Sequence, residues 1–232
     1  MAQVENASKK IKNKNSDIKD AKPKNKKIAK SKIFEIQNYA QSEEFTSAGA
    51  CGVMVLKYLN KNFQPKKDSE FEIWQDAVRG SIWHGSRYGI AYALAKRGAK
   101  PMIFSNITDE GYEKQIAVDE GINLDTLLSS FREVKEKVKE MKIPEKKVKI
   151  TIKKIKEEIN HGNIPILLMN LNSIDPYLES SPHWIVVKGY DDDSIYINDP
   201  YSDNTIAMDP SNFSKGIGYK GEMHMICVRA RK

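Results

Sequence analysis

One stretch of the chain combines a reactive side-chain position with a helix end that could activate it. Residues 41–59, QSEEFTSAGACGVMVLKYL, have a polar lead, a turn of small residues and then an apolar run. The run has no polar face over its first two turns, which predicts a helix buried through the middle of a domain. Ser47 falls at the N-cap or in the first turn, where the helix dipole stabilises a thiolate or an oxyanion. The alternative is a capped core helix without a chemical role.

A second stretch places an imidazole near a carboxylate. His183 begins the apolar strand HWIVVKGY and Asp199 follows the strand SIYIN, with three aspartates between the strands as a hairpin turn signal. Folding the hairpin brings its two open ends within the reach of adjacent or diagonal neighbours. A carboxylate can then orient the imidazole, which can take the proton of a nucleophile. The alternative is an ordinary strand-end His and a turn Asp before Pro200.

The elements that position these residues follow from the hydrophobic pattern. Helices dominate the first part of the chain and an antiparallel sheet dominates the last, which predicts an α+β fold. The predicted elements are an extended segment over 33–40, the buried helix to about 60, a loop over 63–70, helices over 71–80 and 89–97 separated by a loop over 81–88, a strand over 101–105, a charged helical segment over 107–147, a strand over 148–151, a helix over 152–161, and strands over 164–171, 183–190, 194–198 and 223–229.

Composition narrows the class of protein. With 232 residues, of which 40% are hydrophobic, the chain can bury one well-formed core. Its two cysteines, Cys51 and Cys227, make no disulfide framework, so a reducing compartment is expected. No apolar run reaches about 18 residues and no apolar signal core begins the chain, so we expect a cytoplasmic protein without a membrane segment. The His and Cys spacing fits no metal site and no phosphate-binding Gly loop is present, so no cofactor is expected.

The net charge of +7 is unevenly distributed. Residues 1–32 hold eleven lysines and three acids, a net charge of +8, which leaves −1 for the other 200 residues. This Lys-rich tail has almost no apolar content and is expected to be disordered. It could contact an anionic partner such as nucleic acid, or act as a solvated segment or docking arm. The globular domain is expected over 33–232, with 107–147 as a charged helical insertion.

The two chemical stretches together resemble the bacteriocin-processing, double-glycine-type cysteine peptidases of the papain-like clan and their stand-alone intracellular relatives. In that family a Gln lies six residues before a nucleophilic Cys, which opens a central helix in a pattern like T-C-G-P-A-x-L-x-M-x-L-x-Y-L. A His then starts a strand, and an Asp in an N/H-D-P motif ends the next, as in HWIVVKGYDDDSIYINDP. The segment SEFEIWQDAVRGSIWHGSRYGIAYALAKRG, residues 69–98, resembles one subgroup. The resemblance covers about residues 35–215. It implies a papain-like fold, with the central helix packed on a C-terminal antiparallel sheet.

The register of this resemblance selects the nucleophile position. Aligned without gaps, the family's Thr, Ala, Met, Leu, Tyr and Leu fall on Thr46, Ala50, Met54, Leu56, Tyr58 and Leu59. The nucleophile position is then Ser47, six residues after Gln41. Cys51 lies ten residues after Gln41, one turn inside the helix, where a small buried residue is expected. The resemblance favours Ser47 over Cys51.

The resemblance also implies a role for each site residue. Residue 47 attacks the acyl carbon of a peptide or protein substrate. His183 is the general base and then the general acid, and Asp199 orients it. The side-chain amide of Gln41 and the backbone N–H of residue 47 form the oxyanion hole. Hydrolysis and transpeptidation would share the same acyl-enzyme.

A serine at position 47 departs from the family's chemistry. A free thiol has a pKa of about 8.5 that a helix N-terminus lowers readily, whereas a serine hydroxyl is far less acidic and needs a base during attack. The chain as written is therefore predicted to be inactive or severely weakened. Two interpretations stay open: a replacement that silences the nucleophile, or a natural loss that made the domain a peptide-binding module. The intact Gln41, His183 and Asp199 favour the first.

Overall fold

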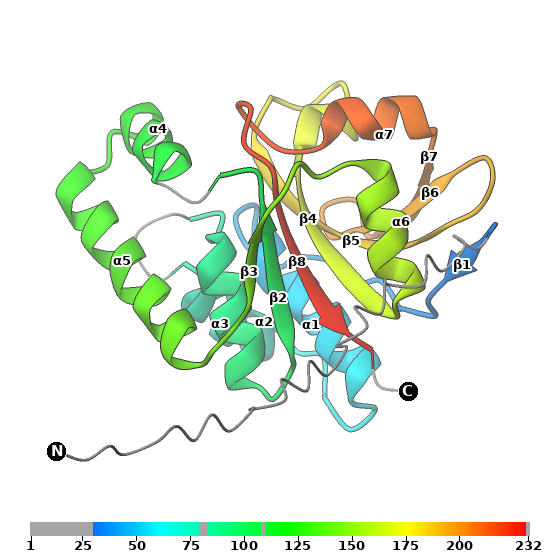
Figure 1. Ribbon diagram of the computed structural model, residues 1–232, viewed down its shortest axis with the longest axis horizontal. Helices are drawn as coiled ribbons and strands as arrows, with labels where there is room; N and C mark the ends of the chain where they lie inside the picture. Colours follow the sequence, from blue (N-terminus) through cyan, green and yellow to red (C-terminus); the bar gives the residue numbers. More distant parts are fainter. Residues whose placement is uncertain (1–29, 79–82, 108–109, 231–232) are drawn as a thin grey trace, which may run out of the picture.

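The computed structural model describes residues 30–78, 83–107 and 110–230. Its helices and strands form one α+β domain, which confirms the predicted fold class (Figure 1). The helices are α1 Ser47–Leu59, α2 Lys67–Ala77, α3 Arg87–Lys96, α4 Gly111–Glu120, α5 Leu124–Glu140, α6 Ile152–Asn160 and α7 Pro210–Gly216, with a 3₁₀ turn η1 at Leu171–Ser173. The strands are β1 Lys32–Ile33, β2 Pro101–Ser105, β3 Glu145–Lys147, β4 Asn163–Asn170, β5 Pro182–Tyr190, β6 Ile195–Asp199, β7 Asn204–Met208 and β8 His224–Arg229.

The described strands form a single sheet of eight strands in the order β3-β2-β8-β4-β5-β6-β7, with β1 paired to β5. Neighbours are antiparallel except β2 and β3, which are parallel. The last strand, β8, lies between β2 and β4 and joins the two halves of the sheet. Six consecutive residues of β4, 164–169, are buried, as expected for a strand covered on both faces.

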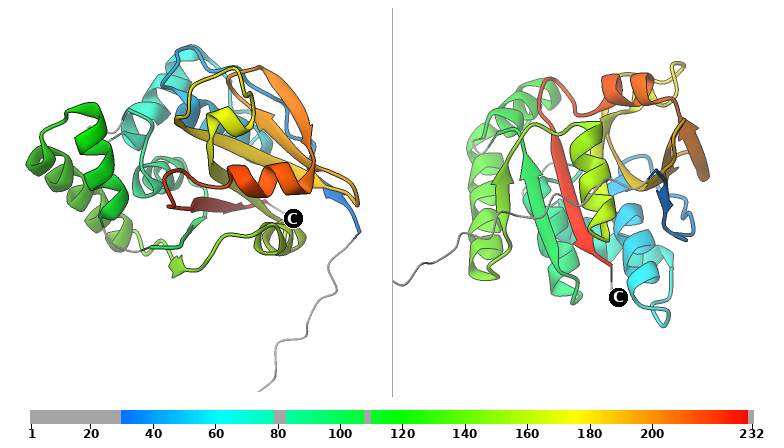
Figure 2. Two further views of the ribbon diagram at one scale, coloured as in Figure 1. Left: turned by 90° about the horizontal axis from the view of Figure 1, so that it is seen from above. Right: turned by 45° about the vertical axis from the view of Figure 1, so that its right-hand side comes forward.

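Helices cover both faces of the sheet. The helices α1, α2 and α3 lie behind the sheet in Figure 1 and α6 lies in front of it, and the view from above in Figure 2 shows the strands between them. The first ten residues of helix α1, 47–56, are buried, as the lack of a polar face predicts. Gly52 allows α2 to approach closely, because a Cβ there would lie 2.6 Å from Cγ2 of Ile73.

Most of the predicted elements are confirmed, and two predictions are wrong. The segment 63–70 was predicted as a loop, but α2 already begins at Lys67, because Asp68 and Glu70 in its first turn complement the helix dipole. The strand predicted over 148–151 lies earlier, at Glu145–Lys147, where it pairs in parallel with β2. The end of the segment 107–147, predicted as helical, is therefore a strand, and the last helix of that segment ends at Glu140. Strand β7 and helix α7 were not predicted. The first is a short edge strand and the second a seven-residue helix capped by Asp209.

The charged segment forms α4, α5 and β3, which lie at one end of the sheet (Figure 1). A buried ion pair connects it to the domain: Nη1 of Arg87 on α3 lies 2.9 Å from Oε1 of Glu113 on α4. Helix α5 buries five residues at helical spacing, Leu127, Leu128, Phe131, Val134 and Val138.

Several predictions concern residues that the structure does not describe. The Lys-rich tail lies outside the described residues as far as residue 29, and β1 begins at Lys32, within the segment predicted as tail. The end of the predicted helix 71–80 and the start of the predicted loop 81–88 also lie outside them. In the part of the chain that is described, no helix has both the length and the apolar character needed to cross a membrane.

Candidate catalytic site

The hairpin of β5 and β6 holds an imidazole–carboxylate pair. The Nε2 atom of His183 lies 2.7 Å from Oδ1 of Asp199, and both side chains are almost completely buried. The register pairs Val186 with Asn198, so His183 and Asp199 are diagonal rather than directly opposite neighbours. The Nδ1 atom is the ring nitrogen turned away from this bond, and it can accept a proton from a nucleophile.

Asp199 is kept ionised by the donors around it. The backbone N–H of Tyr201 donates to Oδ1 at 3.0 Å and that of Ser202 donates to Oδ2 at 3.2 Å. Burial by itself would raise the pKa of Asp199, but the hydrogen bond and charge of His183, together with these donors, hold the pKa below its ordinary value. An ionised carboxylate fixes the tautomer of His183 and stabilises its protonated form.

Ser47 is the first residue of α1 and lies against the start of β5. Its side chain is buried, with 2% of the residue exposed. The backbone N–H of Trp184 donates to its Oγ at 3.4 Å. Because Trp184 directly follows His183, this contact brings the hydroxyl to the strand end that carries the imidazole. In the described part of the chain, the side chain of Thr46 makes no capping hydrogen bond to α1. Ser47 therefore lies at the N–H groups of the first turn and at the positive end of the helix dipole.

Cys51 lies one turn further along α1 and faces the same strand. Its thiol donates to the carbonyl oxygen of Trp184 at 3.3 Å, and the residue is completely buried. Burial, and secondly the charge of Asp199, raise the pKa of Cys51 well above its ordinary value. A neutral, buried thiol is a poor nucleophile. Ser47 and Cys51 therefore contact the same residue through different groups, Ser47 through the N–H and Cys51 through the carbonyl of Trp184. Ser47 lies at the end of the helix and Cys51 lies in the core.

Gln41 belongs to a segment attached to the turn after β6. Its backbone N–H donates to the carbonyl oxygen of Pro200 at 2.9 Å. Its side-chain Nε2 donates to the carbonyl oxygens of Glu43 and Glu44, each at 2.9 Å. Both N–H groups of the amide are therefore engaged within its own loop. A role as an oxyanion donor requires that one of these carbonyls be exchanged for the substrate oxygen.

The structure adds two residues to the site that the sequence did not indicate. Tyr201 presents its ring edge-on to the His183 ring, with centroids 6.5 Å apart, and is 43% exposed. Its position directly after the Asp-Pro dipeptide is the only sequence signal for it. Glu70 is a fully buried carboxylate on α2 that contacts the segment around Gln41. Its sequence signal is an acid on the buried side of an amphipathic helix.

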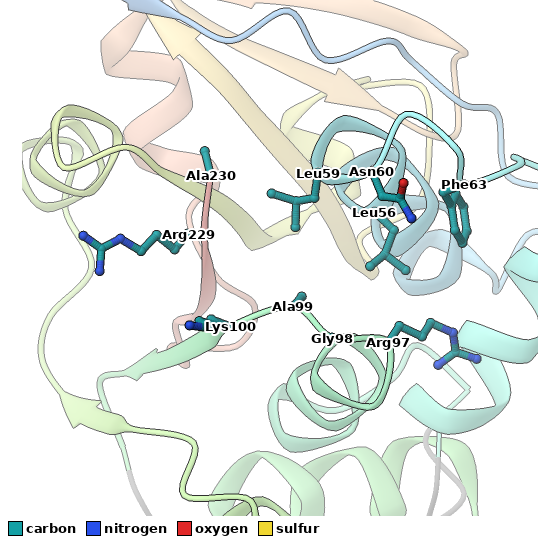
Figure 3. Close-up of a pocket in the computed structure, with 10 residues that line it drawn as sticks. All are labelled: Leu56, Leu59, Asn60, Phe63, Arg97, Gly98, Ala99, Lys100, Arg229 and Ala230. Carbon is teal, nitrogen blue, oxygen red and sulfur yellow. The ribbon is translucent and has the colours of Figure 1, made fainter. Parts of the chain in front are cut away.

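A separate cavity of about 790 Å³ opens at the other end of α1. Figure 3 shows Leu56, Leu59 and Phe63 on one side of it and Ala99 on the other. Leu56, the cavity residue on α1 that is nearest to Ser47 in sequence, lies nine residues along the helix, which at about 1.5 Å per residue is roughly 13 Å away. It is therefore distinct from the candidate catalytic site.

Comparisons with known proteins identify the family of the chain. Residues 36–214 match the model of the family described as the Peptidase_C39 like family, and the chain belongs to that family. This match confirms the resemblance to bacteriocin-processing peptidases. Among solved structures, the chain is similar to a double glycine motif protease from an AMS/PCAT transporter in complex with its leader peptide. The identity is 14%, the TM-score is 0.41, and the match covers 84% of this chain and 94% of that one. A search of the curated proteins found no match.

Proposed function

We propose that this domain is built for acyl transfer at peptide bonds by the cysteine peptidase mechanism, with position 47 as the nucleophile. His183 is its general base and acid, Asp199 orients His183, and Gln41 with the N–H of residue 47 binds the oxyanion. The observation that carries the proposal is the contact of Ser47 Oγ with the N–H of Trp184, next to the buried His183–Asp199 pair. Membership of the family supports the same roles.

With a cysteine at position 47, the reaction proceeds in two steps. The thiol gives its proton to Nδ1 of His183, and the thiolate attacks the acyl carbon of the peptide. The C–N bond breaks as His183 returns the proton to the leaving amine, which leaves a thioester on the enzyme. Water then attacks the thioester with His183 as base, and the acid product and the thiol are released. An amine in place of water gives a new peptide bond.

With the serine present in this chain, the first step is strongly impaired. A hydroxyl gives no ion pair with the imidazole in the resting site, and it must lose its proton during attack. The hydroxyl oxygen is smaller than the sulfur that the proposed mechanism uses, and Ser47 Oγ accepts a hydrogen bond from the backbone N–H of Trp184. We therefore expect little or no peptide cleavage by the chain as written.

The second candidate function is a peptide-binding module derived from a peptidase. It is favoured by Ser47 itself and by the Gln41 amide, which donates to the backbone carbonyl oxygens of Glu43 and Glu44. The codon at position 47 in the chromosomal gene separates the two candidates. A serine codon supports the binding module, and a cysteine codon removes it.

The experiment that tests the peptidase proposal is thiol labelling of the Ser47→Cys variant. We expect iodoacetamide to label one additional thiol rapidly at neutral pH, because the helix end and His183 favour the thiolate. The matched control is Ser47→Cys combined with His183→Ala, in which the rapid labelling should disappear. If Ser47→Cys labels no faster than the unmodified chain, the proposed nucleophile position is wrong.

A further inference from the structure

Glu70 is a buried carboxylate that binds the segment carrying Gln41. It is completely buried on α2. Its Oε1 accepts the backbone N–H of Ser42 at 2.8 Å, and its Oε2 accepts the hydroxyl of Ser42 at 2.5 Å and that of Tyr39 at 3.2 Å. Burying a carboxylate is costly unless hydrogen bonds replace its water. All three of these donors come from one short segment, residues 39–42, so the carboxylate fixes the path of that segment.

The same turn of α2 also lies against the first turn of α1. A Cβ on Gly49 would lie 2.5 Å from the carbonyl oxygen of Glu70 and 3.2 Å from its Cγ. Gly49 is two residues after Ser47 in the first turn of α1. Glu70 therefore contacts both segments that are assigned to the oxyanion hole, one through its carboxylate and the other through its backbone.

We propose that Glu70 is a positioning residue that sets the distance between the Gln41 side chain and the backbone N–H of residue 47. This inference rests on the proposed function, because it gives these two groups a shared task. Donors to an oxyanion act only when they are held where the charge develops. Glu70 lies in the segment SEFEIW, within residues 69–98, which resemble one subgroup of the family. That resemblance assigned no role to Glu70.

A second contact, between α2 and Glu43 in the segment that precedes α1, provides a control. Nζ of Lys67 lies 2.9 Å from Oε1 of Glu43, with 61% and 43% of the two side chains exposed. An exposed ion pair of this kind contributes little to holding a loop in place. Lys67→Ala therefore removes an attachment of α2 to the loop without touching the Glu70 contacts.

The substitution Glu70→Gln keeps the size of the side chain and changes its hydrogen bonding. One carboxylate oxygen becomes an NH₂ group, which then faces a hydroxyl or N–H donor of Tyr39 or Ser42. The two hydroxyls can turn and accept from this NH₂ group, but the negative charge that strengthens all three hydrogen bonds is lost, so the segment is held less firmly. Displacements of about 1 Å at a catalytic donor are enough to lower rates by one to two orders of magnitude.

The first test compares two reactions in the Ser47→Cys background. Turnover of a peptide ending in a Gly-Gly aminocoumarin amide needs the oxyanion hole, whereas alkylation by iodoacetamide needs only the thiolate. We expect Glu70→Gln to lower kcat about tenfold or more, with KM and the alkylation rate within about twofold. Lys67→Ala should leave kcat, KM and alkylation unchanged. An unchanged kcat, or an equal fall in kcat and alkylation, would overturn the inference.

The second test needs no catalytic activity, so its variants keep the serine at position 47. Hydrogen exchange of the Ser42 amide, which donates to Glu70, should become about tenfold faster or more in Glu70→Gln and stay unchanged in Lys67→Ala. If Glu70→Gln does not fold, Tyr39→Phe removes a single donor and should give a smaller fall in kcat. If Ser47→Cys cleaves no peptide, the proposed function has failed. Unchanged exchange at Ser42 would by itself overturn the positioning role.

Discussion

The Nε2 atom of His183 lies 2.7 Å from Oδ1 of Asp199. The other ring nitrogen, Nδ1, therefore faces away from the carboxylate. The bond joins diagonal neighbours on two strands, a geometry that the hairpin itself enforces. Because the ring is fixed through Nε2, its orientation does not depend on the nucleophile at position 47. The proposed base and the acid proposed to orient it are therefore assembled in a chain that carries serine at position 47.

The first prediction concerns Asp199→Asn in the Ser47→Cys background. Asparagine keeps a hydrogen-bonding side chain but loses the negative charge that stabilises protonated His183, so the thiolate–imidazolium pair should form less readily. We expect the apparent pKa of the new thiol to rise by about one unit. The measurement is the rate of iodoacetamide alkylation between pH 4 and 9. Asp192→Asn, at the exposed turn of the same hairpin, is the control and should leave the profile unchanged.

An unshifted profile for Asp199→Asn would mean that the carboxylate does not act on the imidazole. A shift of equal size in Asp192→Asn would point to a general effect of charge on the hairpin instead. Only the combination of a shifted profile at Asp199 and an unshifted one at Asp192 agrees with the assigned role.

The local parts of this site could be predicted from the sequence. The hairpin is encoded by two apolar strands around three aspartates, so the pairing of His183 with Asp199 needs only neighbouring residues. The buried helix and its start at Ser47 follow from an apolar run after a turn of small residues. These features depend on contacts that are close in sequence, for which pattern and propensity are sufficient.

The long-range parts could not be predicted. The contact of Ser47 with Trp184 joins residues 137 positions apart, and only the complete sheet determines it. The insertion of β8 between β2 and β4 also has no local signal. The strand at Glu145–Lys147 was misplaced because it carries charged residues and pairs at the edge of the sheet, where burial does not select apolar side chains. Family resemblance, rather than pattern, selected Ser47 over Cys51.

The second prediction concerns the two native cysteines. Cys51 and Cys227 are buried, and burial raises the pKa of each thiol well above its ordinary value. Neither should react with iodoacetamide at neutral pH in the folded chain, and both should react after unfolding in urea. Mass spectrometry after timed labelling gives the count of modified thiols. Rapid labelling of Cys51 in the folded chain would favour it as the nucleophile and contradict its place in the core.

The third prediction concerns the dependence of stability on pH. Burial raises the pKa of Glu113 to about 7, against the opposing charge of Arg87. The folded state therefore binds the Glu113 proton more tightly, and this group makes the free energy of unfolding fall as pH rises from about 4.5 to 7. Burial, and then the charge of Arg87, lower the pKa of His224 well below its ordinary value. His224 has the opposite effect, and lowers stability as pH falls below about 6.5.

Glu113→Gln removes the first of these opposing effects. We expect its free energy of unfolding to fall more steeply than that of the unmodified chain as pH is lowered from 6.5 to 5, by about 1 kcal/mol per pH unit at most. Urea unfolding at several pH values measures this slope. Glu136→Gln is the control, because it removes an exposed carboxylate of α5 whose ion pair is with Lys139 and not with Arg87. Identical slopes in Glu113→Gln and the unmodified chain would show that Glu113 does not titrate there.

The fourth prediction concerns Gly49, in the first turn of α1. A Cβ at this position would lie 2.5 Å from the carbonyl oxygen of Glu70 and 3.0 Å from Cβ of Trp74. Alanine normally favours a helix over glycine by about 1 kcal/mol, but here the helices α1 and α2 must move apart. We expect Gly49→Ala to lower the free energy of unfolding by about 1–3 kcal/mol, measured by urea unfolding. A stabilised variant would contradict the close approach of the two helices, because propensity would then outweigh the steric clash.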